Sequence, residues 1–490
     1  DSLCVVGDED QSIYAWRGAT VTNILNFPAE FSGAKTITIE QNYRSAQQIL
    51  DIANHIISNN SQRTPKKLWS GKEGKNRVAL VQCASGYQEG DLIVSALKSA
   101  TQQAHIQSVA ILYRAHYQSR IIEEALLKNS IPYLIIGGIQ FYERKEIKDL
   151  LAYLKLLVNP FDRISFIRII NCPSRGLGQK FEELMLEEWS AFPDVSFSEI
   201  CNSLILQEKV SGKKADAVRD FMQMVEEIKS ITQPTKMLES VINKTSYFTY
   251  LRETFEEAEA NTKIENVKEL LRAVAHLEEN GINSLEHLLQ EIALVQDSSK
   301  KNVLKNPTFL MTCHAAKGLE FDLVILTGLE EGIFPSSRSG QTDEQTEEER
   351  RLLYVGITRA KERLIMSKAH YRHTYGALTQ QIPSRFINEM PKESISHLDI
   401  SNLYPASINQ IIKEWFAGIP QQIMAESNYK IHTHSEQKKS NLTAQTGNSQ
   451  TTNLKQFQSV KHTTFGYGNI ESIEKKGAVT YITAQIGRAH

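Results

Sequence analysis

Residues 309–327 read Phe309-Leu-Met-Thr-Cys-His-Ala-Ala-Lys-Gly-Leu-Glu-Phe-Asp-Leu-Val-Ile-Leu-Thr327. The short apolar runs at the two ends of this stretch, 309–313 and 323–327, are typical of buried β-strands. The loop between them carries three polar side chains, those of His314, Lys317 and Glu320. Open parallel sheets bind ligands just past the carboxyl ends of their strands, so this loop is a candidate site. From this stretch alone, solvated loop residues are an equally good interpretation of His314 and Lys317.

Similar apolar runs on both sides of this stretch predict a parallel sheet. They lie at Val78–Cys83, Val109–Tyr113, Tyr133–Ile136 and Leu364–Ser367. Between the second and third runs, residues 119–129 have the apolar spacing of an amphipathic helix. Strand, helix and strand in this order form a βαβ unit, and such units build parallel sheets. Residues 160–305 are instead charged and helix-rich, which predicts a helical domain inserted into an α/β sheet domain.

The composition is that of an ordinary globular protein. The chain has 490 residues, 41% hydrophobic and 23% charged, which indicates about three domains and excludes a collagen-like or largely disordered chain. The formal net charge of −2 gives no sign of a nucleic-acid partner, so such binding must depend on local grooves. No apolar run approaches the ~18 residues of a membrane span, and no membrane partner is expected. Five scattered cysteines without a C-x-x-C pair indicate reduced thiols in a cytoplasmic protein, not a disulfide framework or zinc site.

The two ends of the chain carry expectations of their own. Asp1-Ser-Leu-Cys-Val-Val6 begins within a strand-like run and without an initiator methionine, so we expect the front of the protein to be missing. A polar stretch at 421–457 predicts a flexible linker, and Gly-punctuated alternation at 460–474 predicts a small β module that stops early. Ile486-Gly-Arg-Ala-His490 matches the translation of a common sequencing adapter, which we interpret as read-through; a native strand end is the alternative.

The segment Gly7-Asp-Glu-Asp-Gln-Ser-Ile-Tyr-Ala-Trp-Arg-Gly18 combines carboxylates, an amide, two aromatic rings and an arginine. One interpretation is a Walker B motif, in which Asp8 and Glu9 hold magnesium. A second is a sensor loop, in which Gln11 contacts a terminal phosphate. A capped turn is the structural alternative, but aromatic rings beside an arginine suit base stacking and contact with a nucleic-acid backbone. The phosphate-binding pattern G-x-x-x-x-G-K-[ST] is absent, and its nearest imitation, Trp69–Asn76, is interpreted as a surface turn.

Two more clusters combine aromatic, acidic and basic side chains. Glu40-Gln-Asn-Tyr-Arg-Ser45 places an aromatic ring beside a guanidinium, which suits a stacked base and a phosphate, although a surface Tyr-Arg pair is commoner. Residues 347–364 have acidic side chains first and basic ones last, as a helix dipole favours, with an apolar stripe from Leu353 to Leu364. Arg359 lies off this stripe. It is either an exposed helix charge or an arginine directed at a phosphate across a cleft.

Taken in order, the clusters at 7–18, 40–45, 312–321 and 347–364 resemble motifs III, IV, V and VI of the UvrD/Rep/PcrA superfamily 1 DNA helicases. The resemblance covers residues 1–400. It includes three further stretches, Phe141–Asp149, Pro173–Gly178 and Pro383–Phe386. Phe465-Gly-Tyr-Gly468 resembles the start of the small Tudor-like tail of the UvrD and PcrA branch.

The resemblance implies an α/β fold of the P-loop NTPase type, with ATP between two RecA-like domains. It assigns residues 1–38 to the end of the first domain and both 39–159 and 306–400 to the second. Residues 160–305 become the inserted helical 2B subdomain. The rest is divided into a linker at 401–457, a partial Tudor-like tail at 458–485 and the adapter read-through at 486–490.

The resemblance also implies roles for single residues. For ATP, Gln11 senses the γ-phosphate, Arg44 and Arg359 contact it, Tyr43 stacks on adenine and Glu320 holds the ribose. The single-stranded DNA track is lined by Tyr14, Trp16, Arg17, His314 and Lys317. Asp8 and Glu9 then belong to motif III. The Walker A and B motifs, with the magnesium ligands, are expected upstream of Asp1, so no metal site is expected in this chain.

The implied protein is an ATP- and Mg²⁺-dependent 3′-to-5′ DNA helicase of repair or replication. It would act on single-stranded DNA and on junctions with duplex DNA, with repair proteins or RNA polymerase as candidate partners of its tail. Without Walker A and B, we expect this chain alone to be inactive. Two alternatives stay open: the helicase part of a helicase–nuclease subunit, and a non-catalytic DNA-binding adaptor. The first would need a nuclease carboxylate cluster, and the second has no use for arginines at a γ-phosphate.

Overall fold

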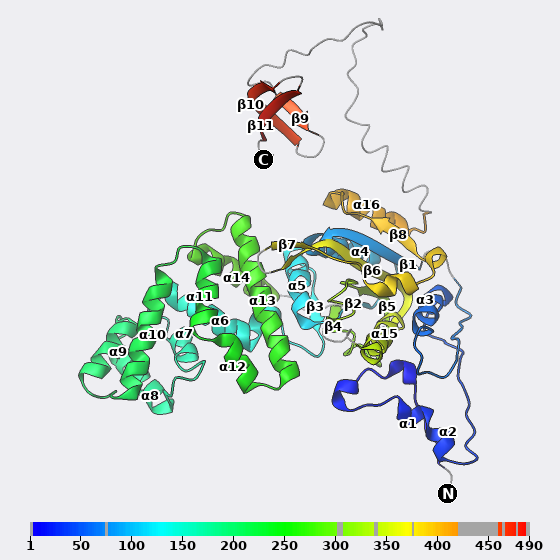
Figure 1. Ribbon diagram of the computed structural model, residues 1–490, viewed down its shortest axis with the longest axis horizontal. Helices are drawn as coiled ribbons and strands as arrows, with labels where there is room; N and C mark the ends of the chain where they lie inside the picture. The colour runs from blue at the N-terminus through cyan, green and yellow to red at the C-terminus, as the bar shows by residue number, and fades with distance from the viewer. Residues whose placement is uncertain are drawn as a thin grey trace, which may run out of the picture. The chain divides into compact units, whose positions relative to one another are not determined.

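The computed structural model describes residues 3–73, 77–300, 307–337, 342–374, 377–419, 459–462, 466–476 and 479–486 (Figure 1). The chain divides into two compact units, Asp1–Glu426 and Ser427–His490, which are described separately below. Among the described residues, no helix is both long enough and apolar enough to cross a membrane.

A mostly parallel sheet forms the centre of the first unit. Its strands are β1 (Val78–Ser85), β2 (Val109–Tyr113), β3 (Tyr133–Ile135), β4 (Thr308–Thr312), β5 (Phe321–Leu326), β6 (Ala360–Thr374), β7 (Ala377–Gln380) and β8 (Ser396–Asp399). The order across the sheet is β3-β4-β2-β5-β6-β1-β8, with every neighbouring pair parallel, and β7 pairs antiparallel with β6. The predicted parallel sheet is therefore confirmed. Strand β4 lies between β2 and β3, so these two strands share the sheet without being neighbours.

Helices cover both faces of the sheet because successive strand residues point to opposite sides. In β1, Val78 and Leu80 belong to the core under α3 (Gln47–Ile57) and α15 (Asp343–Ile357). Their neighbours Ala79 and Val81 belong to the core under α4 (Gly86–Ala100), α5 (Ser119–Lys128) and α16 (Pro405–Phe416). Figure 1 shows α4 and α16 on one side of the sheet and α3 and α15 on the other.

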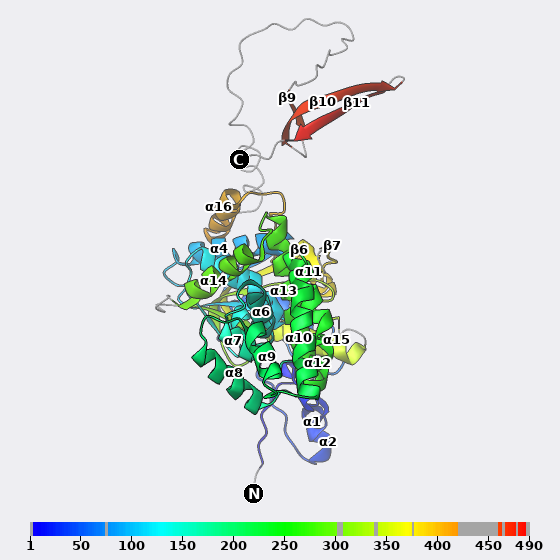
Figure 2. The ribbon, with the colours of Figure 1, turned by 90° about the vertical axis from the view of Figure 1, so that its left-hand side faces the viewer.

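A helical body is inserted between β3 and β4. Its helices are α6 (Lys145–Val158), α7 (Arg163–Ile169), α8 (Gln179–Ala191), α9 (Phe197–Leu206), α10 (Lys213–Lys229), α11 (Pro234–Lys244), α12 (Tyr247–Thr254), α13 (Glu257–Glu279) and α14 (Leu285–Lys300). Figure 2 looks onto this body, where α10, α11 and α13 pack together. Helices thus lie between β3 and β4, as expected, and the core of the helical body begins at Phe141; the subdomain bounds 160–305 stay a prediction. The core begins this early because α6 buries its apolar side chains among the inserted helices.

The first residues of the chain form short turns and helices beside the sheet. These are η1 (Glu9–Gln11), η2 (Ala15–Arg17), α1 (Thr22–Leu25) and α2 (Phe27–Glu30). The strand-like run that starts the sequence is not a strand here. Leu3 and Val6 are 67% and 90% exposed, and none of the described strands lies beside them to complete a ladder.

Two sequence predictions about element boundaries were wrong. The helix expected across 347–364 ends at Ile357, and β6 begins at Ala360, because Leu364 pairs with Val78 of β1 and Val324 of β5. The linker predicted from residue 401 was also wrong over its first residues, which are folded. Residues 405–416 form α16, whose apolar face is buried against α4. The rest of that predicted linker, 420–457, lies outside the described residues.

The second unit contains a small antiparallel sheet with the order β11-β10-β9. Its strands are β9 (Ser459–His462), β10 (Gly466–Lys476) and β11 (Val479–Ile486). A small β module was predicted here and is confirmed, whereas its likeness to a Tudor domain stays a prediction. Ile486 ends β11, and residues 487–490, with most of the predicted read-through, lie outside the described residues.

Candidate functional site

The loop formed by η1 and η2 is fastened to the rest of the unit by its own acidic residues. Arg63 donates two hydrogen bonds to Asp10, at 2.9 and 3.1 Å, and Asp10 is 1% exposed. Lys66 lies 2.7 Å from Asp8, and Glu9 accepts the backbone N–H of Thr64 at 2.9 Å. These carboxylates already have cationic or N–H partners, so their arrangement does not fit a magnesium site. Within the described parts of the chain, no three His, Cys, Asp or Glu side chains lie close enough together to hold a metal ion.

The same loop packs on the segment between β4 and β5. The ammonium of Lys317 donates to the backbone carbonyl of Gln11 at 2.9 Å and lies 5.3 Å from the centre of the Tyr14 ring. The Tyr14 hydroxyl donates to the carbonyl of His314 at 3.3 Å. From α15, Arg351 donates to the Ser12 carbonyl at 2.9 Å. Candidate residues separated by some 300 positions in sequence are thus brought into one surface.

Residues 313–320 cross the sheet from one edge to the other. At the C-terminal edge, where the parallel strands end, the Cys313 N–H donates to the carbonyl of Tyr113, the last residue of β2. At the N-terminal edge, where the strands begin, the Phe321 N–H donates to the carbonyl of Arg359. Gly318 has φ +87°, a conformation that side chains other than glycine rarely adopt. This crossing segment therefore carries His314 and Lys317 near one edge and Glu320 at the other.

Three predicted ATP-site residues meet at the N-terminal edge. Arg44 donates to Glu320 at 2.7 Å and to the carbonyl of Thr358 at 3.4 Å. Arg359 donates to the hydroxyl of the same Thr358 at 3.0 Å. The hydrogen bond from Arg44 holds the pKa of the exposed Glu320 carboxyl below its ordinary value. Two guanidinium groups and one carboxylate are thus gathered around a single threonine.

Arg359 is buried, which contradicts its interpretation as an exposed or solvent-facing helix charge. The residue is 2% exposed, and its guanidinium also donates to the carbonyls of Val355 at 2.9 Å and Leu319 at 3.2 Å. Burial and the nearby charge of Arg44 lower the pKa of Arg359 to about 10, so it remains cationic at neutral pH. Because the helix ends at Ile357, Arg359 lies in the turn that enters β6 and points inward.

Two partly buried histidines lie near the C-terminal edge. Burial lowers the pKa of His314 to about 3, and the nearby charge of Arg114 lowers it further. Burial and the charge of Arg144 lower the pKa of His116 to about 4. Both imidazoles are therefore neutral at physiological pH, so each can make a hydrogen bond but carries no positive charge.

The remaining predicted residues are less closely joined to these clusters. Tyr43 is 75% exposed and donates its hydroxyl to Gln41 at 2.8 Å, which leaves a ring face open to solvent. The side-chain amide of Gln11 donates to Asp8. Arg17 is exposed. The side chain of Trp16 lies outside the described residues.

Sequence reasoning missed the residues that hold the site together. Arg63, Lys66 and Arg351 fasten the η1–η2 loop, and Thr358 joins the two arginines. In the sequence, Lys66 and its neighbour Lys67 look like ordinary surface lysines. Thr358 is the exception. Because it directly precedes Arg359 in the cluster 347–364, the sequence could have marked it as a candidate site residue.

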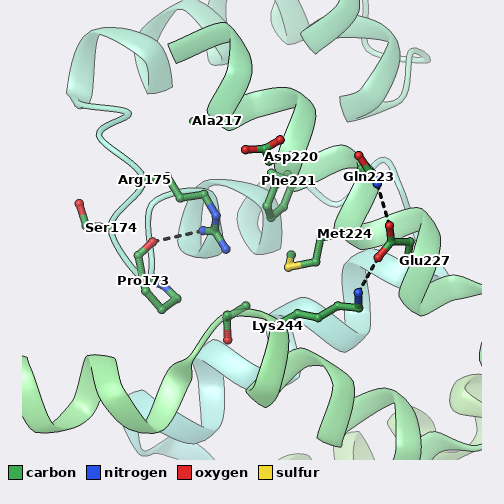
Figure 3. A pocket seen from close by; sticks show the side chains of 11 residues that line it. Pro173, Ser174, Arg175, Ala217, Asp220, Phe221, Gln223, Met224, Glu227 and Lys244 are labelled. Atoms are coloured by element: carbon green, nitrogen blue, oxygen red, sulfur yellow. Dashed lines mark hydrogen bonds and ion pairs between the residues drawn. The ribbon is translucent and has the colours of Figure 1, made fainter. Parts of the chain in front are cut away.

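A separate depression of about 530 Å³ lies in the helical body (Figure 3). Its wall includes Pro173, Ser174 and Arg175 from the stretch 173–178 noted in the sequence. Arg175 donates to the carbonyl of Pro173 at 3.2 Å and to the Tyr153 hydroxyl at 2.7 Å. Across the depression, Lys244 pairs with Glu227. Arg175 therefore serves to hold its own loop against the helices.

Comparisons with known proteins identify the family of this chain. The family model described as UvrD-like helicase C-terminal domain matches residues 37–371, and the one described as UvrD/REP helicase N-terminal domain matches residues 1–32. The chain belongs to the UvrD-like helicase family. Both family matches include candidate residues, since Gln11 and Tyr14 fall in the N-terminal one and Arg44, Glu320 and Arg359 in the C-terminal one.

Curated relatives of this UvrD-like chain are helicases by name. It is 41% identical over 410 residues to the ATP-dependent DNA helicase PcrA of Bacillus subtilis, covering 81% of this chain and 55% of that protein. It is 35% and 34% identical over 482 residues to the DNA helicase II of Salmonella typhimurium and of Escherichia coli, covering 97% of this chain and 63% of each relative. The chain spans a little over half the length of these relatives.

Proposed function

We propose that this chain is part of an ATP-dependent 3′-to-5′ DNA helicase of the UvrD/PcrA type that acts on single-stranded DNA and its junctions with duplex DNA in repair or replication. In this proposal the sheet domain, 39–140 with 306–400, is the second RecA-like domain, because residues 141–158 pack in the core of the helical body. Residues 1–38 are the end of the first, and the helical body is the 2B subdomain. The observation that carries the proposal is the meeting of Arg44, Glu320 and Arg359 at one sheet edge.

The nucleotide would bind at this N-terminal edge. Arg44 and Arg359 supply two fixed positive charges beside Thr358, which suits the charge that builds up on a transferring γ-phosphate. Glu320 would turn from Arg44 to the ribose, and the exposed ring of Tyr43 would stack on the base. Preorganisation favours this arrangement, because the hydrogen bonds of Arg359 to three oxygen atoms fix its guanidinium before any ligand arrives.

Single-stranded DNA would bind near the other edge, over the surface shared by the η1–η2 loop and the crossing segment. Tyr14 and Trp16 offer rings for stacking, while Arg17 and Lys317 offer charges for the backbone. His314, neutral at physiological pH, would contribute a hydrogen bond.

Coupling between the two ligands would run through the crossing segment. One end of this segment carries Glu320, and the other end carries His314 and Lys317. Lys317 donates a hydrogen bond to the carbonyl of Gln11. A change in how the nucleotide holds Glu320 or Gln11 would therefore shift the groups that contact DNA. Such opening and closing of a cleft, repeated with each ATP, would move the strand stepwise.

The sequence contains no G-x-x-x-x-G-K-[ST] loop, and the described carboxylates do not fit magnesium. We therefore propose that these 490 residues alone do not hydrolyse ATP, and that the groups which hold the β-phosphate and magnesium belong to the full-length protein. In this proposal Arg44 and Arg359 orient the γ-phosphate and stabilise its negative charge.

The test compares the full-length protein with this chain. The full-length protein should hydrolyse ATP when single-stranded DNA is added and should unwind a duplex with a 3′ tail, but not one with a 5′ tail. The chain alone should do neither, yet should bind oligonucleotides. Unwinding from the 5′ tail, or turnover by the chain alone, would contradict the proposal.

A further inference from the structure

A second polar depression, of about 540 Å³, lies at the N-terminal edge of the sheet. Its wall is formed by residues at or just before the starts of three strands and by a lysine from the preceding loop. They are Lys72, Arg77, Asp322, Lys361, Glu362 and Arg363. The volume is that of a small-molecule site, which commonly measures about 300–1,000 Å³.

Positive charge exceeds negative charge in this depression, because four cationic side chains face two carboxylates. Lys361 lies 2.9 Å from Asp322, and Asp322 also accepts the backbone N–H groups of Gln107 and Ser108. Glu362 is shared between Arg77 at 3.2 Å and Lys72 at 4.0 Å. Both carboxylates thus have cationic partners, and an excess of two positive charges remains. The exposed imidazole of His105 also borders the space.

Arg363 is the least exposed of these cations, at 7%. Its guanidinium donates to the carbonyl of Phe416 at 2.9 Å and lies 4.9 Å from the centre of the Trp415 ring. Burial, then the like charge of Arg77, lowers the pKa of Arg363 to about 10. Two guanidinium groups that repel each other across a concave space are stabilised when an anion lies between them.

We propose that this depression binds a small phosphate-bearing anion, either an inorganic polyphosphate or the phosphate group of a nucleotide. A nucleic-acid backbone fits less well. The depression lies at the N-terminal edge, whereas the described candidates for the DNA track lie toward the C-terminal edge. The site also borders the arginine cluster, since Lys72 donates to the backbone carbonyl of Arg44 at 3.0 Å. An anion that binds Lys72 would therefore also affect the backbone position of Arg44.

The experiment measures binding by calorimetry on this chain, so it does not depend on ATP turnover. The probes are sodium tripolyphosphate and AMP. Arg77→Gln should weaken binding about tenfold, and Arg77→Gln with Lys72→Gln about a hundredfold, because each charged hydrogen bond is worth about tenfold in affinity. Glu362→Gln should tighten binding several-fold, because it removes a competing carboxylate. The matched control, Lys229→Gln with Lys236→Gln, removes two lysines from exposed helix positions elsewhere and should change nothing.

Comparing the two probes distinguishes binding of a free polyphosphate from binding of a nucleotide. Equal sensitivity of both probes to Arg77→Gln would assign the site to the phosphate itself, and sensitivity of AMP alone would assign it to a nucleotide. Arg44→Ala should leave tripolyphosphate binding within twofold, which distinguishes this site from the proposed ATP site. No binding to the wild-type chain, or equal binding to the double variant, would overturn the proposal. So would an oligonucleotide that binds with this same dependence on Arg77 while tripolyphosphate does not bind.

Discussion

The ammonium of Lys317 lies 2.9 Å from the backbone carbonyl of Gln11 and donates a hydrogen bond to it. This contact joins the crossing segment to the η1–η2 loop, and each of the two carries residues proposed for both ligands. Because the acceptor is a backbone carbonyl, a movement of the Gln11 turn displaces the group to which Lys317 is hydrogen-bonded. The link therefore offers a direct mechanical route between the proposed nucleotide and DNA sites.

Lys317→Met tests this link in the full-length protein. The substitution keeps the length of the side chain but removes the hydrogen bond and the charge above the Tyr14 ring. Because Lys317 is exposed, the melting temperature should change little, whereas the stimulation of ATP turnover by single-stranded DNA should fall several-fold. The measurement is the ratio of turnover with and without DNA. A ratio equal to that of the exposed-lysine control Lys67→Met would remove Lys317 from the coupling route.

Tyr14→Ala tests the proposed stacking surface, and this chain is sufficient for the measurement. A base stacked on an aromatic side chain contributes about 1–3 kcal/mol, so affinity for a short oligonucleotide should fall by roughly 5- to 150-fold. Tyr14→Phe keeps the ring but loses the 3.3 Å hydrogen bond to the His314 carbonyl, and it should bind nearly as well as wild type. Fluorescence anisotropy reports both values. Equal loss in the two variants would show that the hydroxyl, not the ring, matters.

Arg63→Ala should loosen the η1–η2 loop, because it leaves the buried Asp10 with Lys66 as its remaining cation. Breaking a buried ion pair by removing one partner costs roughly 3 kcal/mol. Amide hydrogen exchange in residues 8–18 should accelerate accordingly. Arg219→Ala, which removes an exposed pair with Asp216, is the control and should leave exchange unchanged. Unchanged protection of the loop in Arg63→Ala would mean that other contacts hold it.

The folded unit should lose stability as the pH falls from about 6.5 toward 4. Unfolded histidines have pKa values near 6.5, whereas burial lowers the pKa of His116 to about 4 and that of His314 to about 3. Over this range the unfolded chain binds protons that the folded chain does not, so the free energy of unfolding decreases with falling pH. His116→Gln should reduce the slope of the unfolding free energy against pH by the equivalent of up to one proton. The exposed His287→Gln should not, and identical slopes for the two variants would contradict this assignment.

The sheet and the inserted helices could be predicted from the sequence because their signals are local. Apolar runs such as Val109–Tyr113 are strands wherever a sheet surrounds them, and α5 buries Ile122 and Leu126 as their spacing indicated. The stretch after Ile357 was harder, since it fits both a helical stripe and a strand. Pairing with β5 and β1, which are distant in sequence, decides between the two. The helix α16 has amphipathic apolar spacing, but the polar sequence that follows it favoured a linker.

The site was predictable in its residue types but not in its packing. The motifs placed Arg44, Glu320 and Arg359 together in function, and the structure brings them together in space. The burial of Arg359 could not be predicted, because arginines are usually exposed and its carbonyl partners are visible only in the fold. The ion pair between Asp10 and Arg63 joins residues 53 positions apart, and nothing local announces it.

The burial of Arg359 means that its removal should affect the stability of the fold as well as catalysis. Arg359→Ala would leave a cavity and remove a hydrogen-bond donor from three oxygen atoms, so it should lower the melting temperature as well as ATP turnover. Arg359→Lys keeps the charge but loses the planar fork and should recover stability better than turnover. Thermal melts and turnover are measured on the same full-length preparations. A normal melt for Arg359→Ala would contradict the buried arrangement.

Arg44 offers the cleanest test of the central claim that the N-terminal edge binds the nucleotide. Its side chain is 29% exposed, so Arg44→Ala should fold normally and bind single-stranded DNA normally. The measurement is DNA-stimulated ATP turnover of the full-length protein, with Arg219→Ala as the control. Arginines that stabilise a transferring phosphate contribute about 10³–10⁵ in turnover, so we predict a loss of about 10³ for Arg44→Ala and no loss for the control. Turnover within a few-fold of wild type, in a variant that melts normally, would contradict the account.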